Sequence, residues 1–142
     1  MKFGVSTFLT DQGIAPAALG RAVEERGLDS LLIAEHTHIP VDRRSPYPGG
    51  GEAAFDRVAA LGDAWLANSL PPQELGPKID RLRSIAGRDV PVTVYAVANE
   101  PEIIEQYTQL DVERLLFYLP TLPEPETLSH LDRFSDTAAR FR

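Results

Sequence analysis

The chain has 142 residues, 43% of them hydrophobic and 25% charged, which is typical of a single globular domain but too short for a complete eight-stranded β/α barrel of roughly 200 or more residues. It contains no cysteine, which excludes disulfides, cysteine-bound zinc and thiol catalysis. Its net charge of −7 argues against a surface that follows the phosphates of DNA or RNA.

Short β-rich segments alternate with amphipathic segments in the first part of the chain. Phe3 to Leu9 predicts a strand that ends in a turn at 10–13, and the spacing of apolar residues predicts a helix from about Pro16 to Arg26. The run Ser30 to Ala34 is too short for a helix and is typical of a parallel strand that is covered on both faces.

The same alternation continues to the end of the chain. The further predicted elements are a helix over 53–60, a strand over 64–67, a helix from Pro71 to Gly87, a strand over 90–97, a helix around 103–110, a strand over 114–119 and a final helix over 123–142. We expect Trp65, Phe117 and Tyr118, which lie in these strands, to pack in the core. Five strands and five helices in alternation predict an α/β fold with a parallel sheet and the helices outside it.

The segment 37–51 breaks the alternation, because it contains three prolines and three consecutive glycines. It follows the second predicted strand, and parallel α/β folds bind ligands at the carboxyl ends of their strands. Glu35 and His36 stand at that point and could supply a proton carrier and a group that orients it. Alternatively, Glu35 caps a loop and the histidine is merely half-exposed.

Two further patterns in this region have alternative interpretations. His36 and His38 are alternate residues, so in an extended segment they would face one way and could bind a metal, as in a metal-dependent hydrolase. Arg43 and Arg44 could hold a phosphate or a carboxylate, or they could be a solvated pair that offsets the surrounding acidity.

Several motifs together resemble the luciferase-like monooxygenase family, of which bacterial luciferase is typical, and its branch of oxidoreductases that use the deazaflavin coenzyme F-420. The motifs are MKFGV at 1–5, AEHTHIP at 34–40, SPYPGG at 45–50, AFDRVA at 54–59, GDAWL at 62–66, VPVTV at 90–94 and RLLFYLP at 114–120. They are spread over nearly the whole chain, so the resemblance implies one luciferase-like domain over 1–142.

The resemblance implies a partial (β/α)8 TIM barrel, because the family's barrel is about twice as long. An apparent internal deletion near 51–54 removes the family's third, fourth and fifth strands, and five βα units remain. In a closed barrel the eighth strand pairs with the first. The expected sheet order in this chain's own strand numbering is therefore 3-4-5-1-2.

The resemblance also implies an activity, which is hydride transfer between a flavin-type cofactor, either deazaflavin F-420 or FMN, and a small organic substrate. Glu35 and His36 match the family's acidic–histidine pair, so they are the expected catalytic residues and contact the cofactor together with Ser6. The expected substrate loop contains His38, Arg43, Arg44 and Tyr47. Because the family's glycine-rich loops after the third to fifth strands are absent, the alternative is a catalytically inactive barrel fragment, whether truncated or engineered.

Expectations about partners come from the same patterns. No apolar run approaches the ~20 residues that cross a bilayer, and no secretory signal precedes Asp11, so we expect a soluble cytoplasmic protein without membrane or nucleic-acid partners. An open sheet would leave Ser30–Ala34 and Ala64–Ala67 as uncharged edge strands. We therefore expect a homodimer or a higher homo-oligomer.

Overall fold

A computed structural model describes residues 1–34 and 52–142, in which five strands and five helices alternate and confirm the predicted α/β class. The elements are β1 (Lys2–Thr7), α1 (Pro16–Glu25), β2 (Ser30–Ile33), α2 (Glu52–Leu61), β3 (Trp65–Asn68), α3 (Pro72–Ala86), β4 (Val92–Val97), α4 (Pro101–Thr108), β5 (Arg114–Tyr118) and α5 (Glu124–Arg140).

The strands form one all-parallel sheet in the order β2-β1-β5-β4-β3. This is the expected order 3-4-5-1-2 counted from the opposite edge, so that prediction is confirmed. The last strand, β5, lies in the middle, with Val5 of β1 opposite its Phe117 and Val94 of β4 opposite its Leu115. Strands from the two ends of the chain are therefore neighbours, as they are where a closed β/α barrel joins its last strand to its first.

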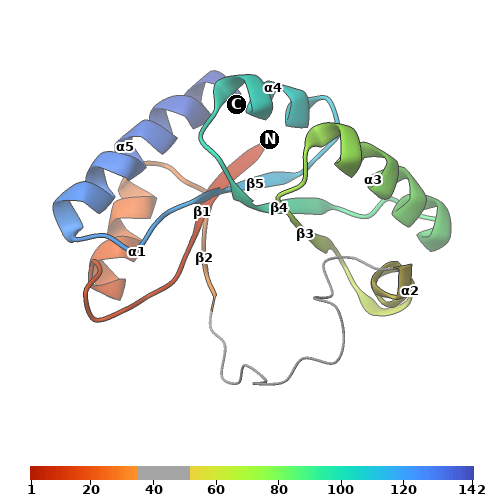
Figure 1. Cartoon of the computed structure of the whole chain (residues 1–142), viewed down its shortest axis with the longest axis horizontal. Helices are drawn as coiled ribbons and strands as arrows, with labels where there is room; N and C mark the ends of the chain where they lie inside the picture. The colour runs from red at the N-terminus through yellow and green to blue at the C-terminus, as the bar shows by residue number, and fades with distance from the viewer. Residues whose placement is uncertain (35–51) are drawn as a thin grey trace.

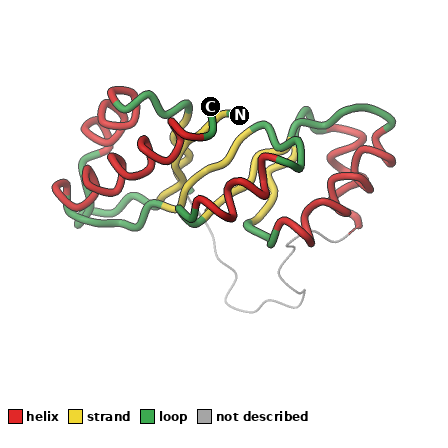
Figure 2. The backbone as a smooth tube through the Cα atoms, turned by 90° about the horizontal axis from the view of Figure 1, so that it is seen from above, coloured by secondary structure: helices red, strands yellow, loops and turns green. Residues whose placement is uncertain are grey.

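The sheet curls into a half-barrel, with its helices on the outer side. In Figure 1, α5 and α1 lie over one half of the sheet and α4, α3 and α2 over the other, so that together they form an arc. The view from above in Figure 2 shows helices to the left and right of the sheet and one helix in front of its middle strands. We call the helix-covered side the convex face and the opposite side the concave face.

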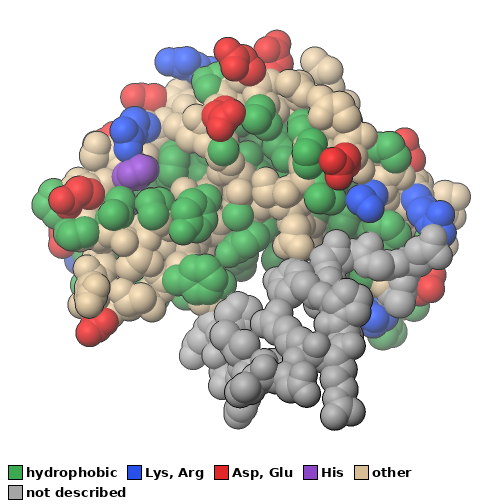
Figure 3. Space-filling model, viewed as in Figure 1, with side chains coloured by type: hydrophobic (Ala, Val, Ile, Leu, Met, Phe, Trp, Pro, Cys, Tyr) green, Lys and Arg blue, Asp and Glu red, His purple; other side chains and the backbone are tan. Residues whose placement is uncertain are grey.

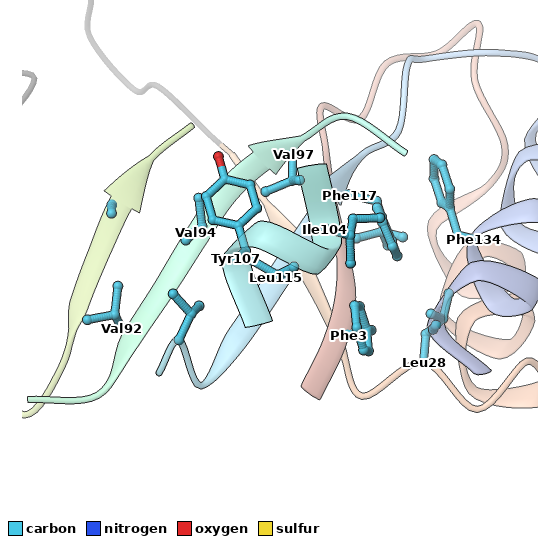
Figure 4. Close-up of a cluster of buried hydrophobic side chains, with 14 of the residues drawn as sticks. Phe3, Leu28, Val92, Val94, Val97, Ile104, Tyr107, Leu115, Phe117 and Phe134 are labelled. Carbon is cyan, nitrogen blue, oxygen red and sulfur yellow. The ribbon is translucent and has the colours of Figure 1, made fainter. Parts of the chain in front are cut away.

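Aromatic and branched side chains fill the space between the convex face and the helices, as Figure 4 shows. The rings of Phe3 and Phe117 stack with centroids 5.8 Å apart, and the ring of Phe134 from α5 stacks on Phe117 at 4.8 Å. Burial of a side chain of this size contributes about 1.5–3 kcal/mol to stability. Stacked rings from β1, β5 and α5 therefore hold one half of the arc to the sheet.

Local sequence explains where several helices begin and end. Pro16, Pro72 and Pro101 open α1, α3 and α4, where a proline lacks only an N–H that has no partner inside the helix. Gly87 ends α3 with a φ of 62°, in the left-handed region that glycine adopts without strain. The predicted ends of α3 are therefore confirmed within a residue.

Some expectations about individual residues are wrong. The first strand ends at Thr7 rather than Leu9, and the fourth begins at Val92 rather than Val90. Tyr118 is 49% exposed instead of packing in the core, because it points from β5 to the concave face. Trp65 and Phe117 are buried as predicted, since they point to the convex face.

The fourth strand contains an irregularity that the pattern of valines reflects. Val92 and Val94 are buried on the convex face, but the next buried valine is Val97, three positions later. Ala96 takes a φ of 58°, and the register with β5 shifts between Val94 and Val97. The extra residue returns Val97 to the convex face, as a β-bulge does.

Within the described ranges, no helix is both long enough and apolar enough to cross a membrane.

Candidate functional site

Ser6 is the predicted site residue that lies in the described part of the chain. The others fall outside the described residues, and their arrangement stays a prediction; they are Glu35, His36, His38, Arg43, Arg44 and Tyr47.

Ser6 lies in the carboxyl half of β1 and is fully buried. Because Phe3 and Val5 face the convex core, the alternation of a strand places Ser6 on the concave face. Its hydroxyl donates a hydrogen bond to the carbonyl oxygen of Phe117, 3.3 Å away on β5. The hydroxyl proton of Ser6 therefore already has a protein acceptor, which ties β1 to β5.

A small cavity lies where β1 and β5 end, between the segments that lead into α1 and α5. Its volume is about 10 Å³, and Thr7, Ile14, Leu119 and Thr127 are among the residues that line it. A space of this size holds about one water molecule, because a single water needs roughly that much room. It is too small for the ring of a cofactor.

A larger pocket lies at the carboxyl ends of β3 and β4. Its volume is about 410 Å³, which falls within the range of roughly 300–1,000 Å³ that is usual for small-molecule sites. The residues that line it carry no formal charge; they are Ser69, Leu70, Pro71, Pro72, Gln73, Val97, Ala98, Ile103, Gln106 and Tyr107. We call it the carboxyl-end pocket, and it is suited to an uncharged, largely apolar group.

Polar contacts fix the walls of the carboxyl-end pocket. The Gln73 side-chain amide of α3 donates to the Gln106 side-chain oxygen of α4 at 2.7 Å. The Tyr107 hydroxyl donates to the Leu70 carbonyl oxygen at 2.5 Å. Burial raises the pKa of Tyr107 above its usual value, and a hydrogen bond with Ser69 opposes part of that shift. Tyr107 is therefore a neutral hydrogen-bond donor across the physiological pH range.

A second hollow lies on the concave face, at the amino-terminal halves of the strands. Its volume is about 290 Å³, and both edge strands contribute to it; the lining residues are Ser30, Leu31, Leu32, Ala64, Trp65, Leu66, Thr93, Arg114 and Leu116. Because the two edges of the sheet face one hollow, the curl of the sheet has brought them towards each other. We call this space the concave hollow.

Two polar atoms of the concave hollow have no hydrogen-bond partner. They are the Ser30 Oγ and the Arg114 Nε, both of which are buried from solvent. Gly4, in the neighbouring strand, allows this close packing, because a Cβ there would lie 2.5 Å from the Ser30 carbonyl oxygen and 2.9 Å from a methyl carbon of Leu116. Only a residue without a side chain fits between these groups.

The described residues contain no group of three histidine, cysteine, aspartate or glutamate side chains that could hold a metal ion. His130 lies on α5, where its ring is 6.0 Å from that of Phe134. Burial lowers the pKa of His130, and the nearby charge of Arg133 lowers it further. His130 is therefore a neutral ring packed on the outer helices, and the metal hypothesis depends on His36 and His38, outside the described residues.

Sequence patterns missed both the carboxyl-end pocket and the concave hollow. One signal was available for the hollow: Arg114 is the only charged residue in its strand, and it alternates with Leu116 and Tyr118, which face the same side. The sheet order was needed to show that Ser30 and Leu66, from opposite edge strands, line the same space as Arg114.

Comparisons with known proteins give relatives without an assigned function. Uncharacterized proteins of Mycobacterium bovis and of two strains of Mycobacterium tuberculosis are 39% identical to this chain over 69 residues. The matched part is 47% of this chain and 24% of each relative, so the chain spans about a quarter of their length. No protein-family model matches the chain, and no solved structure matches it.

Proposed function

We propose that this chain is a shortened luciferase-like oxidoreductase of the cytoplasm, which uses a deazaflavin or flavin cofactor to reduce or oxidise a small organic molecule. The observation that supports this proposal is the sheet order β2-β1-β5-β4-β3. The resemblance implies that order, because the first and last strands of this chain would correspond to the first and eighth strands of a closed barrel. Those two strands are paired where such a barrel closes. The class of reaction comes from the resemblance alone.

The carboxyl-end pocket fits the ring part of such a cofactor. Its volume of about 410 Å³ and its uncharged lining match a planar, mostly neutral ring system. Gln73 and Gln106 line the pocket and hydrogen-bond to each other, and amides can also hydrogen-bond to ring carbonyl and N–H groups. These residues, with the backbone at Leu70, would hold the ring, which when bound supplies the hydride.

His36 would move a proton in this reaction and Glu35 would orient it, because an imidazole changes its charge near neutral pH. The resemblance also implies that Ser6 contacts the cofactor, but Ser6 is buried on the concave face of β1 and does not line the carboxyl-end pocket; its hydroxyl donates to Phe117. His38, Arg43, Arg44 and Tyr47 would contact the substrate. This assignment does not identify the small-molecule substrate.

Titration of the purified chain with coenzyme F-420 and with FMN tests the proposal. We expect saturable changes in cofactor fluorescence for at least one of them at ~100 μM or below, which corresponds to a binding free energy of about 5.5 kcal/mol or more. His36→Ala should abolish turnover while leaving cofactor affinity within twofold. His130→Ala is the matched control, since His130 lies on the outer helices. If neither cofactor binds, the oxidoreductase proposal fails.

A second candidate function is a barrel fragment without catalysis, and the exposed concave face favours it. Leu66 is 53% exposed and Tyr118 is 49% exposed, although such side chains fill the interior of a complete barrel. A chain that binds cofactor but never turns over any substrate would support this candidate. The hydrolase alternative with His36 and His38 predicts a stoichiometric transition metal in protein purified without chelator.

We also propose that the chain forms a homodimer or a higher homo-oligomer. Among the described residues, β2 and β3 are the edges of the sheet, and neither strand contains a charged residue. Uncharged edges expose backbone groups that pair readily with another strand. Light scattering at ~50 μM should give at least twice the mass of 15.6 kDa. A strict monomer would contradict this proposal.

A further inference from the structure

The concave hollow combines an apolar wall with an unpaired cation. Most of its lining is aliphatic or aromatic and comes from four different strands. It lies at the amino-terminal halves of the strands, since Ser30, Trp65 and Arg114 are each the first residue of their strand. The hollow is therefore separate from the carboxyl-end pocket, and a ligand bound in it would be independent of the proposed function.

Among the described residues that line the hollow, Arg114 alone is charged. Its Nε is buried without a hydrogen-bond partner. The nearest carboxylate along the chain, Glu113, forms an ion pair with Lys2 instead, with 2.7 Å between Lys2 Nζ and Glu113 Oε1. Arg114 contributes only a weaker long-range attraction to the lowered pKa of Glu113. Among the described residues, no ion pair holds the guanidinium of Arg114, so a carboxylate in the hollow would find a cationic partner there.

Two residues with hydroxyl groups line the same hollow as this cation. The Ser30 Oγ is the second buried polar atom of the hollow without a partner. Thr93 of β4 is the register partner of Arg114 and lines the same space. A guanidinium and hydroxyls are donors, so this end of the hollow presents hydrogen-bond donors and one positive charge. A carboxylate has the single charge and the acceptor oxygens that match them.

The remaining lining determines the rest of the ligand. Leu32, Leu66 and Leu116 line the hollow, and their side chains carry no polar atom. Leu66 is 53% exposed, so this wall is open to a ligand. The volume of about 290 Å³ lies at the lower limit of roughly 300 Å³ for small-molecule sites.

We propose that the concave hollow binds a small carboxylate with an apolar body, such as a medium-chain fatty acid. The carboxylate pairs with the guanidinium of Arg114, and the apolar body lies against Leu66 and Leu116. Arg114 is the residue that makes the site select an anion. On the face that Figure 3 shows, acidic and basic side chains are spread over the surface of the helices.

Fluorescence of Trp65 gives a direct test, because Trp65 is the only tryptophan of the chain and lines the hollow. Octanoate is the probe, and octanol is its uncharged match. We expect octanoate to change the emission of Trp65 in a saturable way, with an affinity at least about tenfold higher than that of octanol, because hydrogen bonds to a charged group contribute about 1.5–3 kcal/mol. Equal affinities for the two probes, or no saturable change, would overturn the proposal.

Two variants locate the site. Arg114→Gln removes the charge and should weaken octanoate binding at least about tenfold, whereas Arg140→Gln, the same change at the outer end of α5, should leave it unchanged. Circular dichroism checks that both variants fold. The pair Leu66→Glu and Leu66→Gln provides a second comparison at an exposed position, and octanoate should bind more weakly to Leu66→Glu because a new carboxylate repels it. Unchanged binding in Arg114→Gln would contradict the site.

Discussion

The two faces of the sheet are built from the same strands, yet they differ in almost every physical respect. On the convex face, Phe3, Val92 and Leu115 are completely buried beneath helices. On the concave face, Leu66 and Tyr118 are about half exposed. Alternate residues of a strand point to opposite faces, so the contrast arises between direct neighbours in sequence. What covers a face, rather than the residues on it, determines whether those residues form a core.

This contrast indicates which interactions hold the chain together. The five helices bury the convex side chains, so the convex face contributes most of the hydrophobic stabilisation. In a complete barrel the inward side chains also form a packed core. Here that side is partly open, which leaves the concave hollow with an unpaired Arg114 and an unpaired Ser30.

The largest difference between the faces should appear in a pair of identical substitutions. Leu115→Ala removes a fully buried side chain from the convex face of β5 and should lower the free energy of unfolding by about 2–5 kcal/mol. Leu66→Ala changes a half-exposed side chain on the concave face and should cost less than about 1 kcal/mol. Urea denaturation of both variants makes the comparison. Equal losses would mean that the concave face is packed as tightly as the convex one.

Gly4 tests the one place where the concave face is crowded. Gly4→Ala would bring a Cβ to 2.5 Å from the Ser30 carbonyl oxygen, and such overpacking should lower the free energy of unfolding by about 1–3 kcal/mol. The control is Gly20→Ala in α1, where no atom lies within 4 Å of the added Cβ. That change should stabilise the chain by about 0.5–1 kcal/mol, because alanine favours a helix over glycine. The same sign for both variants in thermal melts would refute the contact at Gly4.

Tyr107 tests a polar contact on the helix-covered side. Tyr107→Phe removes the hydrogen bond to Leu70 and should cost about 1 kcal/mol. Burial raises the pKa of Tyr107, so the folded chain keeps this proton at a pH where the unfolded chain loses it. The free energy of unfolding should therefore fall as pH rises above about 10, and it should fall less in Tyr107→Phe. Tyr118→Phe, at a half-exposed position, is the control, and denaturation between pH 8 and 11 measures the effect.

The smallest effect is expected at the exposed rim of the amino-terminal end. The hydrogen bond from Lys2 lowers the pKa of Glu113, so this pair stabilises the chain above the ordinary glutamate pKa of about 4.3, and that contribution is lost as pH falls. Because both side chains are solvent-exposed, Lys2→Ala should cost less than about 1 kcal/mol at pH 7 and nothing at pH 3. A loss that persists at pH 3 in thermal melts would show that Lys2 acts through packing instead of charge.

Some features of the fold could be predicted from the sequence because they depend on neighbouring residues. The prolines that open α1, α3 and α4 and the glycine that ends α3 act within one helical turn. Short apolar segments identified all five strands, and Trp65 and Phe117 pack in the core as expected. The position of Tyr118 was not predictable in the same way, because a strand pattern does not reveal that the described helices all lie on the other face of the sheet.

The sequence by itself determined the α/β class, the number of elements and, through the family resemblance, the order of the strands. Buried valines two positions apart are followed by one three positions later, from Val94 to Val97. The structure shows that this change in spacing reflects a β-bulge at which Ala96 has a positive φ. Only the tertiary structure decided that residues 30, 64–66, 93 and 114 surround one hollow. These positions come from four strands separated by whole βα units, and no local pattern specifies how far a sheet curls or which polar atoms it leaves without a partner.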